Sequence, residues 1–103
     1  MTLPEFTKLL ETTGYPVAFL HFPKEEPHNP PFICYLVIGD STFKADGKNY
    51  SKTTNIQVEL YTLEKDMKAE NKLETALSEF PYEKNEGYLE DVKMYMVTYQ
   101  LTI

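Results

Sequence analysis

Hydrophobic and polar residues alternate with period two in two long segments of this chain, and this period is typical of β-strands. In residues 54–62, Ile56, Val58 and Leu60 alternate with polar or aromatic neighbours. Such a strand packs one face on a core and turns the other toward water or a partner. Residues 93–103 alternate in the same way, with threonine and methionine on the second face. We therefore expect both faces of this last strand to be covered.

Helical spacing of apolar residues appears in two other segments. Residues 2–13 begin with Thr2 and Glu5, which are spaced as a capping box. Residues 63–80 place their apolar side chains on one stripe, with Thr62 as the expected N-cap. The members of the stripe are Ala69, Leu73, Ala76, Leu77 and Phe80. We expect this stripe to pack on the apolar face of the strand at 54–62.

Shorter extended segments complete the pattern. A turn is expected at residues 39–41, and Asp46-Gly47 is a strong hairpin signal. The assignment of residues 82–88 stays open between a strand and an irregular stretch. The remaining strands are expected at residues 17–22, 32–38, 42–45 and 48–50.

The element order is therefore α-β-β-(ββ)-β-α-β, which predicts an α+β fold. Hairpin-like connections favour a mainly antiparallel sheet with the two helices packed on it. With 103 residues and no repeat or linker, the chain is expected to form a single domain over residues 1–103. A domain of this size buries enough surface to fold without a disulfide or a metal ion.

One connection stands out, because residues 23–31 hold four of the seven prolines. Proline fixes one backbone angle and cannot donate to a sheet, so we expect a stiff, extended, exposed loop here. Loops of this length on a rigid scaffold are often functional.

Composition excludes several classes of function. The net charge is −6, from sixteen acidic residues and ten lysines, and arginine is absent. Affinity for nucleic acid depends on cationic contacts with phosphate, so sequence-specific nucleic-acid binding is not expected. The longest apolar-rich stretch, residues 32–38, is far shorter than the roughly 20 residues of a membrane helix. No signal peptide is visible, so we expect synthesis in the cytoplasm and no membrane segment.

Candidates for chemistry are few. Cys34 lies in an apolar strand and is expected to be a buried, inert thiol. The spacing of His21, His28 and Cys34 differs from that of zinc sites. Glu70 and Glu74 form a carboxylate pair that is expected to be a solvated helix face. We therefore predict no catalytic residue, metal or cofactor. Two classes stay open: a small regulatory or ligand-binding α+β module, and an enzyme that uses Cys34 or a carboxylate pair.

The order and spacing of four segments resemble a known group of proteins. Residues 6–19 and 30–36, followed by residues 46–50 and 56–62, resemble small tail-region proteins of siphophages and prophages of Gram-positive bacteria. The resemblance covers nearly the whole chain and rests on order and spacing, because no single motif is a chemical signature.

The resemblance implies a non-enzymatic tail terminator, also called a tail completion protein, or a neighbouring head–tail connector. Such proteins form a ring, typically a hexamer, on the head-proximal end of the tail tube. The implied partners are further copies of the chain, the tail tube protein and the connector proteins, and the implied location is the virion neck.

Assembly through such contacts needs an exposed surface, and two segments are candidates. Tyr61 is one of eight tyrosines and is expected on the wet face of its strand, where an aromatic ring can anchor an interface. The stiff proline-rich loop would lose little entropy on docking. The candidate interaction residues are Pro27, His28, Pro30, Pro31, Gln57, Glu59 and Tyr61.

Overall fold

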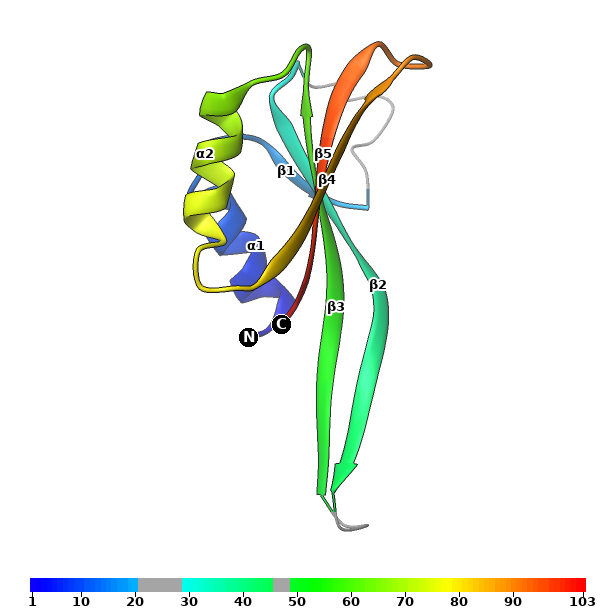
Figure 1. Cartoon of the computed structure of the whole chain (residues 1–103). Coiled ribbons are helices and arrows are strands. Elements are labelled where there is room, and N and C mark those ends of the chain that lie inside the picture. Colours follow the sequence, from blue (N-terminus) through cyan, green and yellow to red (C-terminus); the bar gives the residue numbers. More distant parts are fainter. Residues whose placement is uncertain (21–28, 46–48) are drawn as a thin grey trace.

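The computed structural model of the protein describes residues 1–20, 29–45 and 49–103. Two helices and five strands follow one another in the order α-β-β-β-α-β-β (Figure 1). Among the described residues, no helix is both long and apolar enough to cross a membrane. The elements are α1 (Leu3–Glu11), β1 (Val17–Phe19), β2 (Phe32–Ala45), β3 (Asn49–Thr62), α2 (Met67–Ala76), β4 (Tyr82–Leu89) and β5 (Met94–Thr102).

The five strands form one sheet in the order β1-β2-β3-β5-β4. All neighbouring pairs are antiparallel except β1 and β2, which are parallel. Both helices lie on the same side of the sheet (Figure 1). The predicted α+β fold, a mainly antiparallel sheet with two helices packed on it, is confirmed.

Local sequence explains the first helix. The Thr2 side chain accepts from the Glu5 backbone, and the Glu5 side chain accepts from the Thr2 backbone at 2.9 Å, so the predicted capping box is present. Phe6 and Leu10 on the next turns are fully buried. The helix ends at Glu11, two residues before the predicted end at Thr13.

The predicted turn at residues 39–41 is wrong. β2 continues through it to Ala45, with only a register irregularity between Val37 and Gly39. A bulge absorbs one extra residue without ending the strand, and glycine often marks one. The four expected strands at 32–38, 42–45, 48–50 and 54–62 are therefore two long strands, β2 and β3. Their connection at 46–48 lies outside the described residues.

The second helix is shorter than predicted, and its cap is a different residue. It spans Met67–Ala76, and the Asp66 side chain accepts from the Ala69 backbone at 3.0 Å. Thr62 is not the cap, because α2 begins five residues later and the Thr62 hydroxyl donates to the Glu64 carbonyl at 2.7 Å. The N-cap of α2 is therefore Asp66, which directly precedes the helix, and not Thr62 at the end of β3.

The structure also settles the bounds of the two edge strands, β4 and β1. The open segment at 82–88 is a strand, β4, paired with β5 from Tyr82 to Leu89. β1 is confirmed over Val17–Phe19, but it ends before Leu20, which the prediction included. Residues 21 and 22 of the predicted range lie outside the described residues.

The core lies between the helices and one face of the sheet. Leu73 of α2 is fully buried and belongs to the same cluster as Phe6 of α1, so both helices share one core. Ala76 and Phe80 of the predicted stripe are only half-buried. The buried sheet residues are Ile33, Tyr35, Ile56, Val58, Leu60, Val97, Tyr99 and Leu101.

Candidate interaction surface

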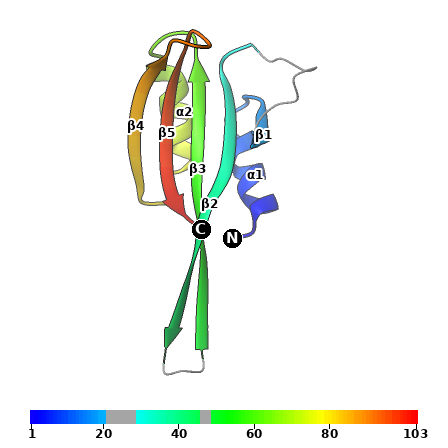
Figure 2. The ribbon, with the colours of Figure 1, turned by 90° about the vertical axis from the view of Figure 1, so that its right-hand side faces the viewer.

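The sheet has an outer face, opposite the helices, which no helix of the described residues covers (Figure 2). In Figure 2 the sheet faces the viewer and α2 lies behind it. The strand register places on this face the residues that alternate with the core positions. Its central members are Phe32, Cys34 and Leu36 of β2, Gln57, Glu59 and Tyr61 of β3, and Met96, Thr98 and Gln100 of β5.

Three of the predicted interaction residues form a connected row on the outer face. Glu59 accepts hydrogen bonds from the Tyr61 hydroxyl at 2.9 Å and from the Gln57 amide at 2.8 Å. Gln57 in turn accepts from Gln100 of β5 at 2.9 Å. Burial, followed by the charge and hydrogen bond of Glu59, raises the pKa of Tyr61. The row is therefore held in place, and Tyr61 stays protonated as a donor.

The structure also brings the end of the proline-rich loop beside this row. Phe32 directly follows Pro31, and its ring stacks on Tyr61 with centroids 4.9 Å apart. Pro30 and Pro31 line a hollow together with residues 62–67. Pro27 and His28 lie outside the described residues.

Gln100 and Phe32 were missed by the sequence interpretation. The alternation of the last strand places Gln100 on the face opposite Tyr99, so that signal was available. The pairing of Phe32 with Tyr61 required the register of β2 against β3, which only the fold supplies.

A second feature of the surface is the ribbon, defined as residues 40–45 of β2 paired with residues 49–54 of β3. It extends beyond the body of the sheet (Figures 1 and 2). At its base, Thr54 and Ile103 exchange backbone hydrogen bonds of 3.0 and 2.9 Å. Six facing pairs at about 3.4 Å each make the ribbon about 20 Å long. A two-stranded hairpin is at best marginally stable in water, so an isolated ribbon favours a role in binding.

Ionisable residues gather on the other side of the sheet, between α2 and β4. Glu70 is only 1% exposed, and one of its oxygens accepts from Lys65 at 3.0 Å and from Lys84 at 2.8 Å. Glu74 accepts from Lys84 at 2.7 Å and from the Tyr99 hydroxyl at 2.8 Å. The expectation that Glu70 and Glu74 form a solvated helix face is therefore wrong for Glu70.

This charged network joins the helix to the edge strand. Burial alone would lower the pKa of Lys84, but hydrogen bonds to Glu70 and Glu74 outweigh burial and raise it. Lys65 also donates to Glu86 of β4 at 2.8 Å. Each cation is paired with two carboxylates, so the arrangement fastens β4 against α2 and leaves no cation available to a substrate within this network.

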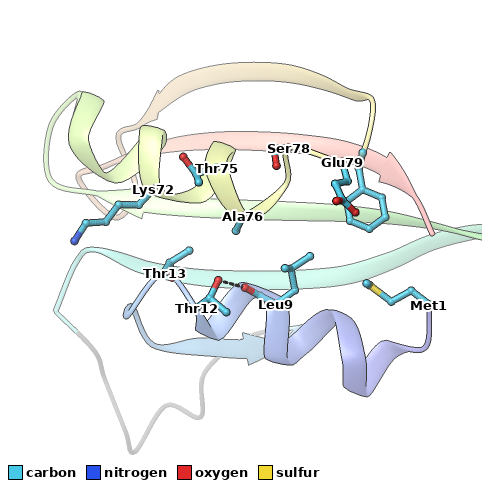
Figure 3. A pocket seen from close by; sticks show the side chains of 10 residues that line it. Met1, Leu9, Thr12, Thr13, Lys72, Thr75, Ala76, Ser78 and Glu79 are labelled. Atoms are coloured by element: carbon cyan, nitrogen blue, oxygen red, sulfur yellow. Dashed lines mark hydrogen bonds between the residues drawn. The ribbon is translucent and has the colours of Figure 1, made fainter.

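An open groove of about 720 Å³ separates the two helices (Figure 3). Leu9, Ala76 and Phe80 contribute apolar surface to it. Its hydroxyl groups are largely turned to the helices themselves, since Thr12 donates to the Leu9 carbonyl and Thr75 to the Asn71 carbonyl. The groove thus lacks the converging polar groups that orient a small ligand.

Cys34 is buried, at 4% exposure, as expected for a structural thiol. Within residues 1–20, 29–45 and 49–103, no three His, Cys, Asp or Glu side chains come together as a metal site would require. His21 and His28 fall outside those ranges.

Comparison with protein-family models gives no match for this chain, and comparison with curated proteins gives no relative.

Proposed function

We propose that the protein is a structural component of a phage tail, which acts in tail completion at the head–tail junction as a ring of identical copies. The proposal starts from the order and spacing of residues 6–19, 30–36, 46–50 and 56–62, which resemble small tail-region proteins. The observation that carries it structurally is the ribbon, a projecting two-stranded element. Residues 40–45 and 49–54 pair with each other in it, and neither β1 nor β5 continues alongside them.

The distribution of the helices over the two faces of the sheet supports the same proposal. Both helices cover one side of the sheet, so that side supplies the core and the stability. On the outer face, which no described helix covers, the half-buried pair Phe32–Tyr61 and the row around Glu59 offer a surface to a neighbour. Aromatic rings and fixed polar groups are characteristic of interface centres.

The acidity of the chain fits a position around the DNA channel of a tail. A net charge of −6 gives a surface that repels the phosphate backbone. A ring that lines such a channel must let DNA slide through without binding it.

The test is a null mutant of the phage that encodes the chain, with its particles examined by electron microscopy. A tail terminator predicts over-long tails without heads, because nothing caps the growing tube. A connector role predicts tails of normal length that fail to join heads. Normal, infectious particles from the null mutant would contradict both roles.

A second variant tests the ribbon itself. Deleting residues 41–44 together with 50–53 removes four facing pairs and preserves the alternation of the strands. We expect particles with the defect of the null mutant. The control variant, Lys8→Ala with Glu11→Ala, removes two exposed charged side chains from α1. It should leave the particles infectious.

A further inference from the structure

Besides the three-residue edge strand β1, two longer strand edges lack a neighbouring strand among the described residues. One is the ribbon beyond its base at Thr54, which bonds to Ile103. Along the rest of the ribbon neither neighbouring strand continues, because β1 pairs with β2 only over Val17–Phe19 and β5 pairs with β3 only as far as Asn55. The other is β4, the last strand of the sheet order. A row of unpaired N–H and C=O groups is a ready template for a further strand.

The two edges carry opposite charge. Residues 40–54 contain three lysines and two aspartates, a net charge of +1, which leaves −7 for the rest of a chain whose total is −6. Residues 82–91 contain four acidic residues and Lys84, a net charge of −3. Lys84 is already bound to Glu70 and Glu74, and Glu86 is bound to Lys65. Outside these ion pairs, the exposed acidic residues of this edge are therefore Glu83 in β4 and Glu90 and Asp91 in the turn that follows it. Opposite charges favour encounter and fix register between surfaces.

β4 is also well suited to accept a strand. The ion pairs of Lys84 with Glu70 and Glu74, and of Glu86 with Lys65, hold it against α2. A rigid acceptor edge loses little conformational entropy when a strand docks. The opposite edge strand, β1, offers only three residues, and residues 15–20 carry no charge.

We propose that the ribbon of one copy adds as a strand to the β4 edge of a second copy of this chain. The proposal rests on the proposed function and names the contact that joins the copies of the ring. The contact is heterologous, since each copy uses its ribbon toward one neighbour and its β4 edge toward the other. The ribbon continues the direction of β2 and β3. In the proposed ring, these strands therefore lie along the circumference, so that the ribbon of each copy reaches β4 of the next.

Two single-cysteine variants test the contact, both in a Cys34→Ala background. Ser51→Cys places a thiol on the ribbon, and Glu83→Cys places one on exposed β4. A short bismaleimide should crosslink a mixture of the two variants into dimers, but neither variant alone. A chain that carries both cysteines should give a ladder of oligomers.

The experiment is run on the purified protein at its highest soluble concentration and in lysates where tails assemble. Dimers from the mixture in either setting support the contact. Dimers from one variant alone would show a two-fold contact and overturn the proposal. Absence of mixed dimers in both settings would also overturn it.

Charge reversal tests the electrostatic part in the same assay. Lys44→Glu with Lys52→Glu should reduce mixed dimers about tenfold, because attractive contacts become repulsive. Glu83→Lys with Glu90→Lys on the partner copy, with the acceptor cysteine moved to Asn85→Cys, should restore them. The matched control, Lys8→Glu with Lys68→Glu on the exposed helix surfaces, changes the net charge equally and should have no effect. An equal loss of mixed dimers in the control would show that the effect depends on the net charge of the chain, and would overturn the proposed pairing of charges.

The outcomes for the contact and for the tail function can be told apart. Mixed dimers together with normal particles from the null mutant would retain the contact and reject the tail function. Defective particles from the null mutant together with no mixed dimers would retain the tail function and reject the contact.

Discussion

Glu70 sits in the first turn of α2, where a carboxylate interacts favourably with the helix dipole. Its side chain is buried, with one oxygen bound to Lys65 and Lys84. The other oxygen, Oε2, has no hydrogen-bond partner among the described residues. Buried carboxylates are expensive unless they are paired, so this residue depends on its two lysines.

We therefore expect Glu70→Gln to lower the free energy of unfolding by about 1–3 kcal/mol, because the amide keeps the shape but loses the charge that both lysines bind. Urea unfolding followed by circular dichroism measures the change. Glu64→Gln, at an exposed position just before the helix, should change stability by less than about 0.5 kcal/mol. Equal effects of the two substitutions would contradict a special role for Glu70.

At the scale of elements, α2 fastens the sheet in two ways. Its apolar side buries Ala69, Leu73 and Leu77 in the common core. Its charged side holds β4 through Glu70 and Glu74. The first attachment is independent of pH, and the second is not.

The apolar attachment predicts the effect of Leu73→Ala. Leu73 is fully buried, so the substitution should lower the free energy of unfolding by about 2–5 kcal/mol. Leu63→Ala is the matched control, because Leu63 is 65% exposed and should lose less than about 0.5 kcal/mol. A small effect at Leu73 would place α2 away from the core and contradict the fold.

The charged attachment predicts a dependence on pH. Burial opposes ionisation of Glu74, but hydrogen bonds from Lys84 and Tyr99 outweigh it and lower the pKa of its carboxyl. Hydrogen bonds from Lys65 and Tyr95 lower the pKa of Glu86. A depressed pKa in the folded state stabilises the fold above the unfolded value of about 4.3. This contribution is lost as the pH falls through the folded values.

Thermal unfolding from about pH 7 to pH 3 tests this dependence. Glu74→Gln should unfold at a lower temperature than the wild type near neutral pH, and the difference should shrink toward acid. Glu79→Gln, at an exposed glutamate after the same helix, is the matched control and should unfold within about 2 °C of the wild type near neutral pH. A constant difference for Glu74→Gln would show that its charge plays no part.

At the scale of the whole molecule, the residues that stabilise the fold and the projecting ribbon are in different parts of the structure. The helices, the shared core and the charged network all lie on one side of the sheet. The ribbon leaves the body at the point where β5 ends, and its two strands pair with each other. The body should therefore fold without the ribbon.

Deleting residues 41–44 together with 50–53 tests this separation by thermal unfolding. We expect a midpoint within about 4 °C of the wild type, a change below about 1 kcal/mol for a domain of this size. Shortening a loop lowers its closure entropy only slightly. A large loss of stability would mean that the ribbon belongs to the folding unit, and the particle phenotype of the same variant would then report misfolding.

Local patterns in the sequence determined the element types, because their causes are local. Period-two alternation produced β3 and β5, the capping box began α1, and the apolar stripe placed Leu73 in the core. Alternation also put Gln57, Glu59 and Tyr61 on one face, so part of the candidate surface was predictable.

Only the tertiary structure decided which faces meet and how far the strands run. The ribbon exists because β2 continues past a register shift between Val37 and Gly39 instead of turning, and this depends on continued pairing with β3. The burial of Glu70 needed Lys84, fourteen residues later, to lie beneath α2. Phe32 stacks on Tyr61 through the same long-range register. Contacts between distant residues have no signature in a local pattern, since their free energy arises only when the elements pack.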